Sequence, residues 1–251
     1  MRSDLIALVP IKDRRGAKSR LSPYLDEVER QCLALHMLED VLTALAGVTR
    51  LTAVLVSHDD EAIRLAQSLR MITIPDRGLG ETDAVQFATS WATNRCAQGT
   101  LVIPADVPLI TSQEIKAILT ASEETGIGSA ENPSDAERKA NSKVPVPISS
   151  LTEHKPRSTV LVPSRDGRGT NAALRCPPDL FPLRFGNDSF QPHVAQAERS
   201  GAPCKILPLP GLGLDIDEAD DLRELVNRPG QTQSQRYVRS MGIADRLMAA
   251  W

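Results

Sequence analysis

Three aspartates in this sequence have the residue type and spacing that a metal-dependent phosphate site requires. Asp215 and Asp217 form an Asp-x-Asp triplet, and in an extended chain residues two apart share one face, so both carboxylates can reach one metal ion. Asp106 follows a short apolar run and stands between Pro104 and Pro108, which restrict the backbone there. Hard carboxylate oxygens suit a Mg²⁺ ion that also bridges phosphates. The alternatives are that Asp106 caps a turn or helix and that Asp217 caps the helix after it.

A cationic loop near the start of the chain supplies the opposite charge. The apolar residues 5–9 end at Pro10, and the loop that follows carries Lys12, Arg14, Arg15, Lys18 and Arg20. A buried strand that leads into such a loop is typical of an α/β protein that binds an anion at the carboxyl end of its first strand. The loop lacks both glycine-rich phosphate patterns, so side chains would hold a phosphate. Taken with the three aspartates it indicates a two-metal phosphoryl or nucleotidyl transfer site, although alone it could be a solvated basic turn.

Two glycine-containing segments could present neutral hydrogen-bond partners to a ligand. The first covers residues 165–171 and ends in Thr170 and Asn171. The second covers residues 185–190 and contains Gly186 and Ser189. Glycines allow the backbone to approach a ligand closely, and hydroxyl and amide groups supply donors and acceptors. Each segment could equally be an ordinary turn.

Strands and helices alternate along the chain. Short apolar runs predict strands at residues 5–9, 51–56, 71–74, 100–103, 159–162 and 206–209. Apolar residues at helical spacing predict helices at residues 26–45, 59–69, 82–91, 112–121 and 217–226. This order predicts an α/β fold with a mostly parallel, doubly wound sheet. Ligands bind at the carboxyl ends of the strands in such a sheet, which is where Asp106 and the cationic loop fall.

The pattern predicts one catalytic domain over residues 1–228 and a helical tail over 229–251. Residues 126–158 interrupt it with a polar, proline-containing segment that has little apolar periodicity. We expect a mobile insertion there, because few apolar contacts would offset the cost of ordering it. The tail carries apolar residues at helical spacing and could dock on its own domain or on a second subunit, so a monomer or a homodimer is expected.

Composition excludes several kinds of partner. The formal net charge of −3 and the pI near 5.9 argue against a nucleic-acid partner. No apolar run approaches the roughly 18 residues that span a bilayer, so no membrane partner is expected. Four scattered cysteines without a Cys-x-x-Cys pair, and the lack of a signal peptide pattern, predict a cytoplasmic protein with reduced thiols.

Five motifs occur in the order found in one enzyme family. They are Pro10-x-Lys12 with Ala17–Leu21, Pro104–Leu109, Arg165–Asn171, Phe185–Phe190 and Pro210–Asp217. Over about Leu5–Leu225, the insertion apart, the chain resembles the 2-phospho-L-lactate guanylyltransferase family of coenzyme F420 biosynthesis. The resemblance implies a fold of the nucleotide-diphospho-sugar transferase (GT-A-like) type. It also implies transfer of GMP from GTP to a small phosphorylated acid (2-phospho-L-lactate, phosphoenolpyruvate or 3-phospho-D-glycerate) with release of pyrophosphate.

The resemblance also implies a role for each matching residue. It assigns two Mg²⁺ ions to Asp106, Asp215 and Asp217. It assigns the phosphorylated acid to Lys12, Thr170, Gly186 and Ser189. It assigns GTP to Lys18, Arg20, Thr82 and Pro104. Lys12 and Lys18 would also act in catalysis, as the cations that stabilise charge on the reacting phosphates.

One segment departs from the family pattern. Relatives usually have a Gly-Leu-Asn-x-Ala-like segment near the nucleotide, whereas this chain has Gly80-Glu-Thr-Asp-Ala84. Thr82 stands at the position of the asparagine. The residue that contacts the guanosine and the identity of the acceptor acid therefore stay open.

The implied chemistry needs no general base. The attacking group is a phosphate oxygen that is already an anion at neutral pH, which agrees with the interpretation of His58 and His193 as structural or surface residues. A nucleotidyltransferase with a sugar phosphate or another acceptor is an alternative, and a catalytically silent nucleotide-binding module is a second one. Three metal-type carboxylates speak against the silent module.

Overall fold

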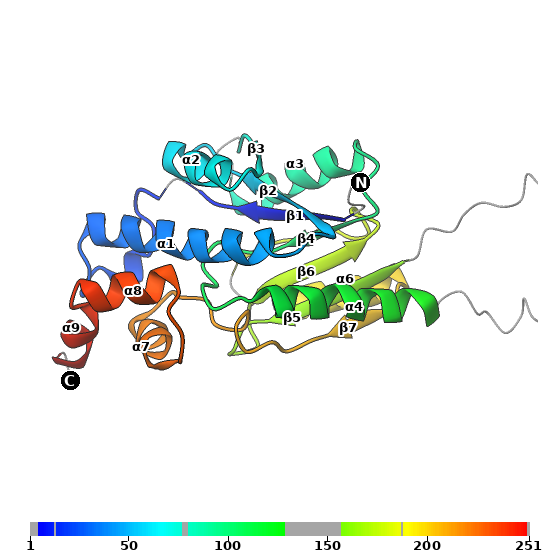
Figure 1. The fold of residues 1–251 in the computed structure, drawn as a ribbon. Helices are drawn as coiled ribbons and strands as arrows, with labels where there is room; N and C mark the ends of the chain where they lie inside the picture. Colours follow the sequence, from blue (N-terminus) through cyan, green and yellow to red (C-terminus); the bar gives the residue numbers. More distant parts are fainter. Residues whose placement is uncertain (1–4, 13, 77–79, 129–156, 187, 250–251) are drawn as a thin grey trace, which may run out of the picture.

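A seven-stranded sheet forms the centre of the molecule. The computed structural model describes residues 5–12, 14–76, 80–128, 157–186 and 188–249, and the ribbon in Figure 1 shows these elements. The strands are β1 (Leu5–Pro10), β2 (Leu51–Val56), β3 (Ile72–Ile74), β4 (Gly99–Val102), β5 (Ser158–Pro163), β6 (Thr170–Cys176) and β7 (Cys204–Ile206). Their order is β3-β2-β1-β4-β6-β5-β7. Strand β6 runs antiparallel to β4 and β5, and the other neighbouring strands are parallel.

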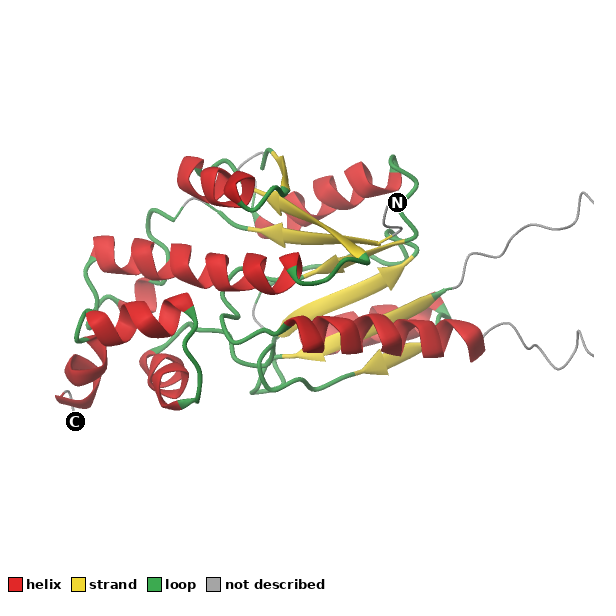
Figure 2. Cartoon of the chain, in the orientation of Figure 1, coloured by secondary structure: helices red, strands yellow, loops and turns green. Residues whose placement is uncertain are grey.

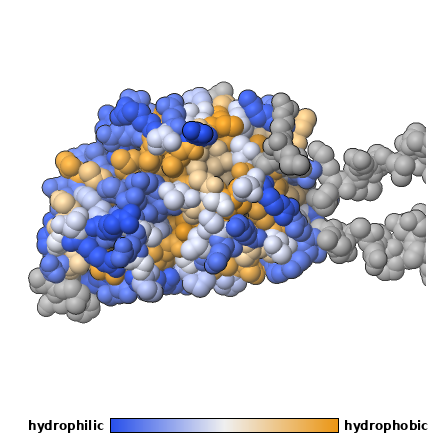
Figure 3. Space-filling view, viewed as in Figure 1, coloured by the Kyte–Doolittle hydropathy of each residue, from blue (hydrophilic) through white to orange (hydrophobic). Residues whose placement is uncertain are grey.

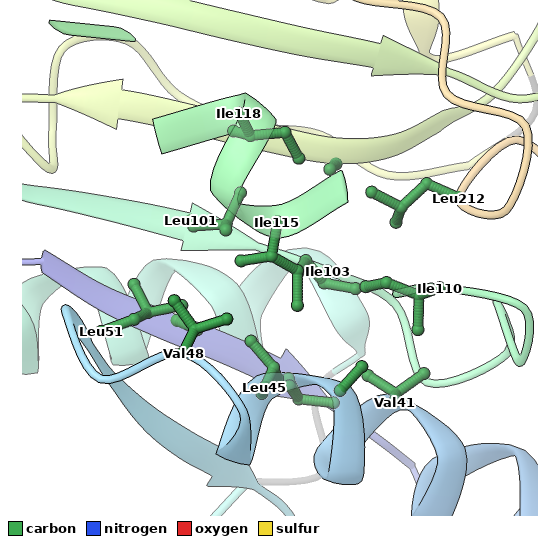
Figure 4. Packing of buried hydrophobic residues seen from close by; sticks show 14 of the residues in the cluster. Val41, Leu45, Val48, Leu51, Leu101, Ile103, Ile110, Ile115, Ile118 and Leu212 are labelled. Carbon is green, nitrogen blue, oxygen red and sulfur yellow. The ribbon is translucent and has the colours of Figure 1, made fainter. Parts of the chain in front are cut away.

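Helices cover both faces of this sheet. They are α1 (Glu27–Ala46), α2 (Asp60–Ser68), α3 (Glu81–Thr93), α4 (Ser112–Gly128), α6 (Phe190–Ser200), α7 (Ala219–Asn227), α8 (Gln233–Ser240) and α9 (Ile243–Ala249), with a short 3₁₀ turn at Ser19–Leu21. On one face, side chains of α1 and α4 meet those of β4, as Figure 4 shows for Leu45, Ile115 and Leu101. Helices α3 and α6 contribute to a second buried cluster on the other face. Burial on both faces explains why β1 is a continuous run of aliphatic residues.

The predicted fold class is confirmed, and three local predictions need correction. The strand predicted at residues 206–209 is instead Cys204–Ile206, and residues 207–209 follow it without regular structure. Strand β6 and helix α6 were not predicted, and they begin at the ends of the two predicted ligand segments, at Thr170 and at Phe190. Helix α4 continues past its predicted end at residue 121 to Gly128, and β5 begins at Ser158, so both edges of the predicted insertion belong to regular elements. Residues 129–156 lie outside the described part of the chain.

The C-terminal helices pack against their own chain. In Figures 1 and 2 helix α8 lies beside α1, with α7 and α9 next to it at one end of the molecule. Leu222, Val238 and Ile243 from these helices share a buried cluster with Leu33 and Met37 of α1. Figure 3 shows hydrophilic residues gathered over α7 and α8 on the outside. Within the described residues, no helix has both the length and the apolar character that crossing a membrane requires.

Asp40 of α1 caps the start of α8. Its carboxylate accepts hydrogen bonds from the backbone N–H of Gln233 at 2.7 Å and of Ser234 at 3.0 Å. It also accepts one from the Ser234 hydroxyl at 2.6 Å. These bonds satisfy groups at a helix N-terminus that have no partner within the helix, and a carboxylate there also interacts favourably with the helix dipole.

We expect Asp40→Ala to lower the free energy of unfolding by about 2 kcal/mol, because it leaves these donors without a partner. Urea titration followed by circular dichroism measures the change. Asp245→Ala, at an exposed acidic position in α9, is the matched control and should change stability by less than about 0.5 kcal/mol. Equal stabilities of the two variants would show that the cap contributes nothing.

Candidate active site

The three predicted metal ligands lie in two segments that are joined through their backbones. The N–H of Ile216 donates a hydrogen bond to the carbonyl of Asp106 at 3.1 Å. Leu214 and Ile216 point into the core, with 1% and 0% of their surface exposed. The alternation of an extended chain then turns Asp215 and Asp217 to the opposite side, as the Asp-x-Asp spacing predicts.

Lys18 bridges two of these carboxylates. Its Nζ atom donates to Asp106 Oδ2 at 2.6 Å and to Asp217 Oδ1 at 2.8 Å, and only 10% of its side chain is exposed. Burial alone would lower the pKa of Lys18, but the two carboxylates outweigh burial and raise it well above its ordinary value. The Lys18 backbone adopts a left-handed conformation with φ of 52°, which lysine rarely adopts, so this turn needs support from its surroundings. The two short ion pairs supply part of that support.

Asp215 has a neutral partner in place of a cation. The Asn171 side-chain amide donates to Asp215 Oδ1 at 3.1 Å and to the Leu212 carbonyl at 2.8 Å. Burial raises the pKa of Asp215, and the nearby charges of Asp106 and Asp217 raise it further. Two of the three carboxylates share one lysine and the third has no cation in an ion pair within the described residues, so the site can accept more positive charge.

The donor set fits magnesium. The oxygens of three carboxylates are the hard ligands that Mg²⁺ takes in sites that also bind phosphates. In the described part of the chain, however, no three acidic, histidine or cysteine side chains already form a metal-binding group. Lys18 Nζ stands between Asp106 and Asp217. An ion held by both carboxylates would therefore require Lys18 to move.

A cavity of about 440 Å³ opens beside this group. Its lining includes Lys12, Lys18, Glu81, Pro104, Asp106 and Asp217. Arg20 also lines it and forms an exposed ion pair with Glu218 at 3.4 Å. Arg14 stabilises the loop, because its Nε donates a hydrogen bond to Asp59 at 3.0 Å and its Nη1 donates one to the Gln31 carbonyl at 3.1 Å.

Glu81 is a site residue that sequence analysis did not single out. It begins helix α3 and lines the first cavity. Burial and the charge of Asp106 raise the pKa of Glu81 to about 7, with Lys12 and Lys18 opposing the rise. The only signal in the sequence is that Glu81 belongs to the segment that departs from the family pattern.

A second cavity, of about 470 Å³, adjoins the first. Arg20 and Asp217 line both, and Arg165, Arg168, Gly186 and Asp215 line the second alone. The two arginines belong to a motif that the sequence singled out for its glycines, Thr170 and Asn171. Both form ion pairs, Arg165 with Asp221 and Glu224 and Arg168 with Asp188.

The remaining predicted ligand residues stand outside these cavity walls. Thr170 and Ser189 are buried, with 4% and 5% of their surface exposed. Thr82 lines a separate cavity, and its hydroxyl accepts a hydrogen bond from the Phe185 backbone N–H at 3.2 Å. The structure therefore brings Lys12, Lys18, Arg20, Pro104 and the three aspartates together around two joined cavities. It places Gly186 at the second cavity, with Thr170, Ser189 and Thr82 away from both linings.

His193 joins Thr170 to the segment that carries Gly186. Its Nε2 accepts a hydrogen bond from the Arg184 backbone N–H at 2.9 Å, so Nδ1 carries the proton and donates it to Thr170 Oγ1, also at 2.9 Å. Burial, with a smaller contribution from the charge of Arg175, lowers the pKa of His193 to about 4. His193 is therefore a neutral structural residue at pH 7.

Comparison with known proteins gives matches over most of the chain. The family model described as "Guanylyl transferase CofC like" matches residues 5–131 and 144–248. A phosphoenolpyruvate guanylyltransferase from Sphaerobacter thermophilus is 35% identical over 221 residues, covering 88% of this chain and 91% of the relative. A 3-phospho-D-glycerate guanylyltransferase from Colwellia psychrerythraea is 30% identical over 90% of this chain and 91% of its own. A 2-phospho-L-lactate guanylyltransferase from Methanocaldococcus vulcanius is 28% identical over 95% of this chain and 92% of its own.

Solved structures show the same fold. A protein described as a nucleotide-diphospho-sugar transferase from Desulfovibrio desulfuricans superposes with a TM-score of 0.70 at 17% identity, covering 99% of this chain and 98% of the other. A cytidylyltransferase from Leptospira borgpetersenii superposes with a TM-score of 0.54 at 10% identity, covering 98% and 97%. These likenesses confirm the fold type that the motifs implied.

We expect His193 to make stability fall in mild acid. Its pKa is about 4 in the folded chain and about 6.5 in an unfolded one, so the unfolded state binds the proton more readily. The contribution is complete above pH 6.5 and is lost as the pH falls toward 4. Between pH 7 and pH 5 the wild-type chain should lose about 2 kcal/mol more than His193→Gln, measured by urea titration.

The interval from pH 7 to pH 8 is the internal control, because His193 is almost neutral in both states there. The two chains should change in parallel over that interval. Parallel behaviour down to pH 5 as well would show that His193 is not held neutral by the fold.

Proposed function

We propose that this chain, which belongs to the CofC-like guanylyl transferase family, transfers GMP from GTP to the phosphate of a small phosphorylated acid and releases pyrophosphate. The observation that carries the proposal is the pair of cavities that meet at Asp217, one beside the cationic loop and one beside Arg165 and Arg168. The first suits a nucleoside triphosphate and the second a small phosphorylated acid. By its motifs, the reaction belongs to coenzyme F420 biosynthesis.

The acceptor is proposed to be one of the three acids that name the relatives. Phosphoenolpyruvate, 2-phospho-L-lactate and 3-phospho-D-glycerate each combine a phosphate with a carboxylate. Arg165 and Arg168 can recognise such groups through forked N–H donors, since arginine matches the geometry of carboxylates and phosphates. Both would have to exchange their present carboxylate partners for the acceptor.

The reaction joins two anions, so its main requirement is positive charge. An oxygen of the acceptor phosphate forms a bond to the α-phosphorus of GTP, and the bond from that phosphorus to pyrophosphate breaks. The attacking oxygen is already ionised at neutral pH and requires no base. Lys18 and Arg20 would bind the triphosphate, and Lys12, which the motifs assign to the acid, lines the same cavity. All three cations would reduce the repulsion between the two substrates.

Asp106, Asp215 and Asp217 are proposed to hold magnesium. When bound, Mg²⁺ would supply positive charge between the two substrates and orient the phosphates for in-line displacement. Without a bound metal ion, Lys18 supplies the positive charge beside Asp106 and Asp217. We propose that Lys18 turns from these aspartates to the triphosphate when substrate and metal bind.

The experiment that tests the function is incubation of the protein with GTP, MgCl₂ and each of the three acids in turn. Pyrophosphate release together with a product of the mass of the guanylylated acid is the expected result. Release with a sugar phosphate in place of the acids would favour the related nucleotidyltransferase. Tight GTP binding with no release for any acceptor would favour a silent module.

We expect Asp106→Ala, Asp215→Ala and Asp217→Ala each to lower turnover by more than 100-fold while the chain stays folded. Each substitution removes charge and geometry from a site that needs all three carboxylates. Asp60→Ala, at an exposed acidic position of α2, is the matched control and should keep wild-type turnover. Near wild-type rates at saturating magnesium for any two of the three would refute this ligand set.

We expect Lys18→Met to bind Mn²⁺ in the absence of GTP at least tenfold more tightly than the wild type, because the partly buried carboxylates of Asp106 and Asp217 lose their cation. Turnover should fall at the same time, because the triphosphate loses a ligand. Titration calorimetry measures the first effect and pyrophosphate release the second. Lys12→Met is the control, since Lys12 makes no ion pair with either aspartate in the described structure, and its Mn²⁺ affinity should not rise.

A further inference from the structure

A third cavity, of about 330 Å³, lies between helix α3 and the segment that links β6 to α6. The helix contributes Thr82, Gln86, Thr89 and Ser90, and the linking segment contributes Asp179, Phe181 and Arg184. None of its lining residues lines either cavity of the candidate active site. The proposed reaction therefore does not account for it.

Arg175 of β6 also lines this cavity and is almost fully buried, with 2% of its surface exposed. Its Nη1 donates to the Phe181 carbonyl at 2.5 Å, and its Nη2 donates to the hydroxyls of Thr89 at 3.0 Å and Thr100 at 3.3 Å. All three acceptors are neutral. Within the described residues its Nε has no hydrogen-bond partner, and no carboxylate lies within ion-pair distance of the guanidinium.

A buried cation without a counter-ion is costly for the fold. Desolvation disfavours the charged form, and buried guanidinium groups are normally paired with an acid. Burial accordingly lowers the pKa of Arg175 to about 10, which Asp179 only partly opposes, and the group stays cationic at neutral pH. An anion that binds beside Arg175 would therefore stabilise the folded chain.

The rest of the lining suits an oxyanion. Thr82, Thr89 and Ser90 offer hydroxyls, and Gln86 offers an amide. Arg184 supplies a second cation at an exposed position, and its charge opposes that of Asp179, an exposed carboxylate that also lines the cavity. Forked guanidinium donors match the oxygens of a phosphate or a carboxylate. We propose that this cavity binds a small oxyanion, the phosphate or carboxylate group of a metabolite, at a site separate from both substrate cavities.

The position of the cavity would connect such a ligand to the active site. Thr82 accepts a hydrogen bond from Phe185, whose neighbour Gly186 lines the second substrate cavity. Glu81, which precedes Thr82 at the start of α3, lines the first. A bound oxyanion would thus contact the two segments that reach the two substrate cavities.

Thermal unfolding with inorganic phosphate, or with malonate as the carboxylate probe, tests the proposal at constant ionic strength. The full chain carries Lys12→Met, Lys18→Met and Arg168→Met, which remove cations from the substrate cavities. At ten times its dissociation constant, the probe should raise Tm by roughly 3–6 °C. Adding Gln86→Phe, whose ring would fill the third cavity, should abolish the rise, while Gln113→Phe on exposed α4 should preserve it.

The two probes distinguish the source of the oxyanion, and a rise with either supports the site. No rise with both probes in the parent variant, or a rise that survives Gln86→Phe, would overturn the proposal. Anomalous diffraction from selenate provides a measurement that does not depend on the variants. A selenate peak within hydrogen-bond distance of Arg175 supports the site, and selenate bound only elsewhere contradicts it.

Discussion

The crowding of negative charge at one edge of the sheet is the constraint on which the rest of this structure depends. Asp106, Asp215 and Asp217 converge there, and Glu81 adds a fourth carboxyl group. Lys18 relieves part of the repulsion through two short ion pairs. Burial raises the pKa of Glu81 to about 7, the charge of Asp106 adds to the rise, and near neutral pH this carboxyl group therefore adds less charge to the cluster. The net negative charge that remains at the site favours the binding of cations.

The fold keeps these carboxylates in place by anchoring the residues between and beside them. Leu214 and Ile216 are buried in the cluster that also receives the C-terminal helices, so the aspartates beside them cannot rotate into solvent without removing apolar side chains from the core. Gly211 lies so close to the backbone of Leu109 that a side chain would not fit there. Helices α7 to α9 therefore support the position of these aspartates although none of the three belongs to them.

The sequence allowed the fold class and the family to be predicted, and the common face of Asp215 and Asp217, because each depends on a local pattern. Continuous aliphatic runs mark the parallel strands, and the spacing of Asp215 and Asp217 already determines that they share a face. Strand β6 carries no such mark. It begins with Thr170 and Asn171, contains the buried Arg175, and pairs antiparallel with β4 and β5. A polar, glycine-flanked strand cannot be distinguished from a ligand loop by periodicity.

The parts that could not be predicted are contacts between segments far apart in the chain. Thr82 meets Phe185, and the buried guanidinium of Arg175 meets Thr89 and Thr100, across long stretches of sequence. Nothing near Thr82 in the sequence indicates that the backbone of a distant segment uses its hydroxyl. A motif assigns a residue to a ligand from the residues that flank it in the sequence. The contacts of its side chain, however, are made with residues that lie close to it in the folded chain.

The distribution of charge also explains why the candidate site contains no catalytic histidine. When the attacking phosphate oxygen is already ionised, it has no proton for a general base to remove. A base would therefore not increase the rate. Positive charge between the substrates is what lowers the barrier. Lysine or arginine side chains line both cavities, together with carboxylates, of which Asp217 lines both. His193 can therefore remain neutral and buried, holding Thr170 and the Arg184 backbone in place, without any loss to the proposed chemistry.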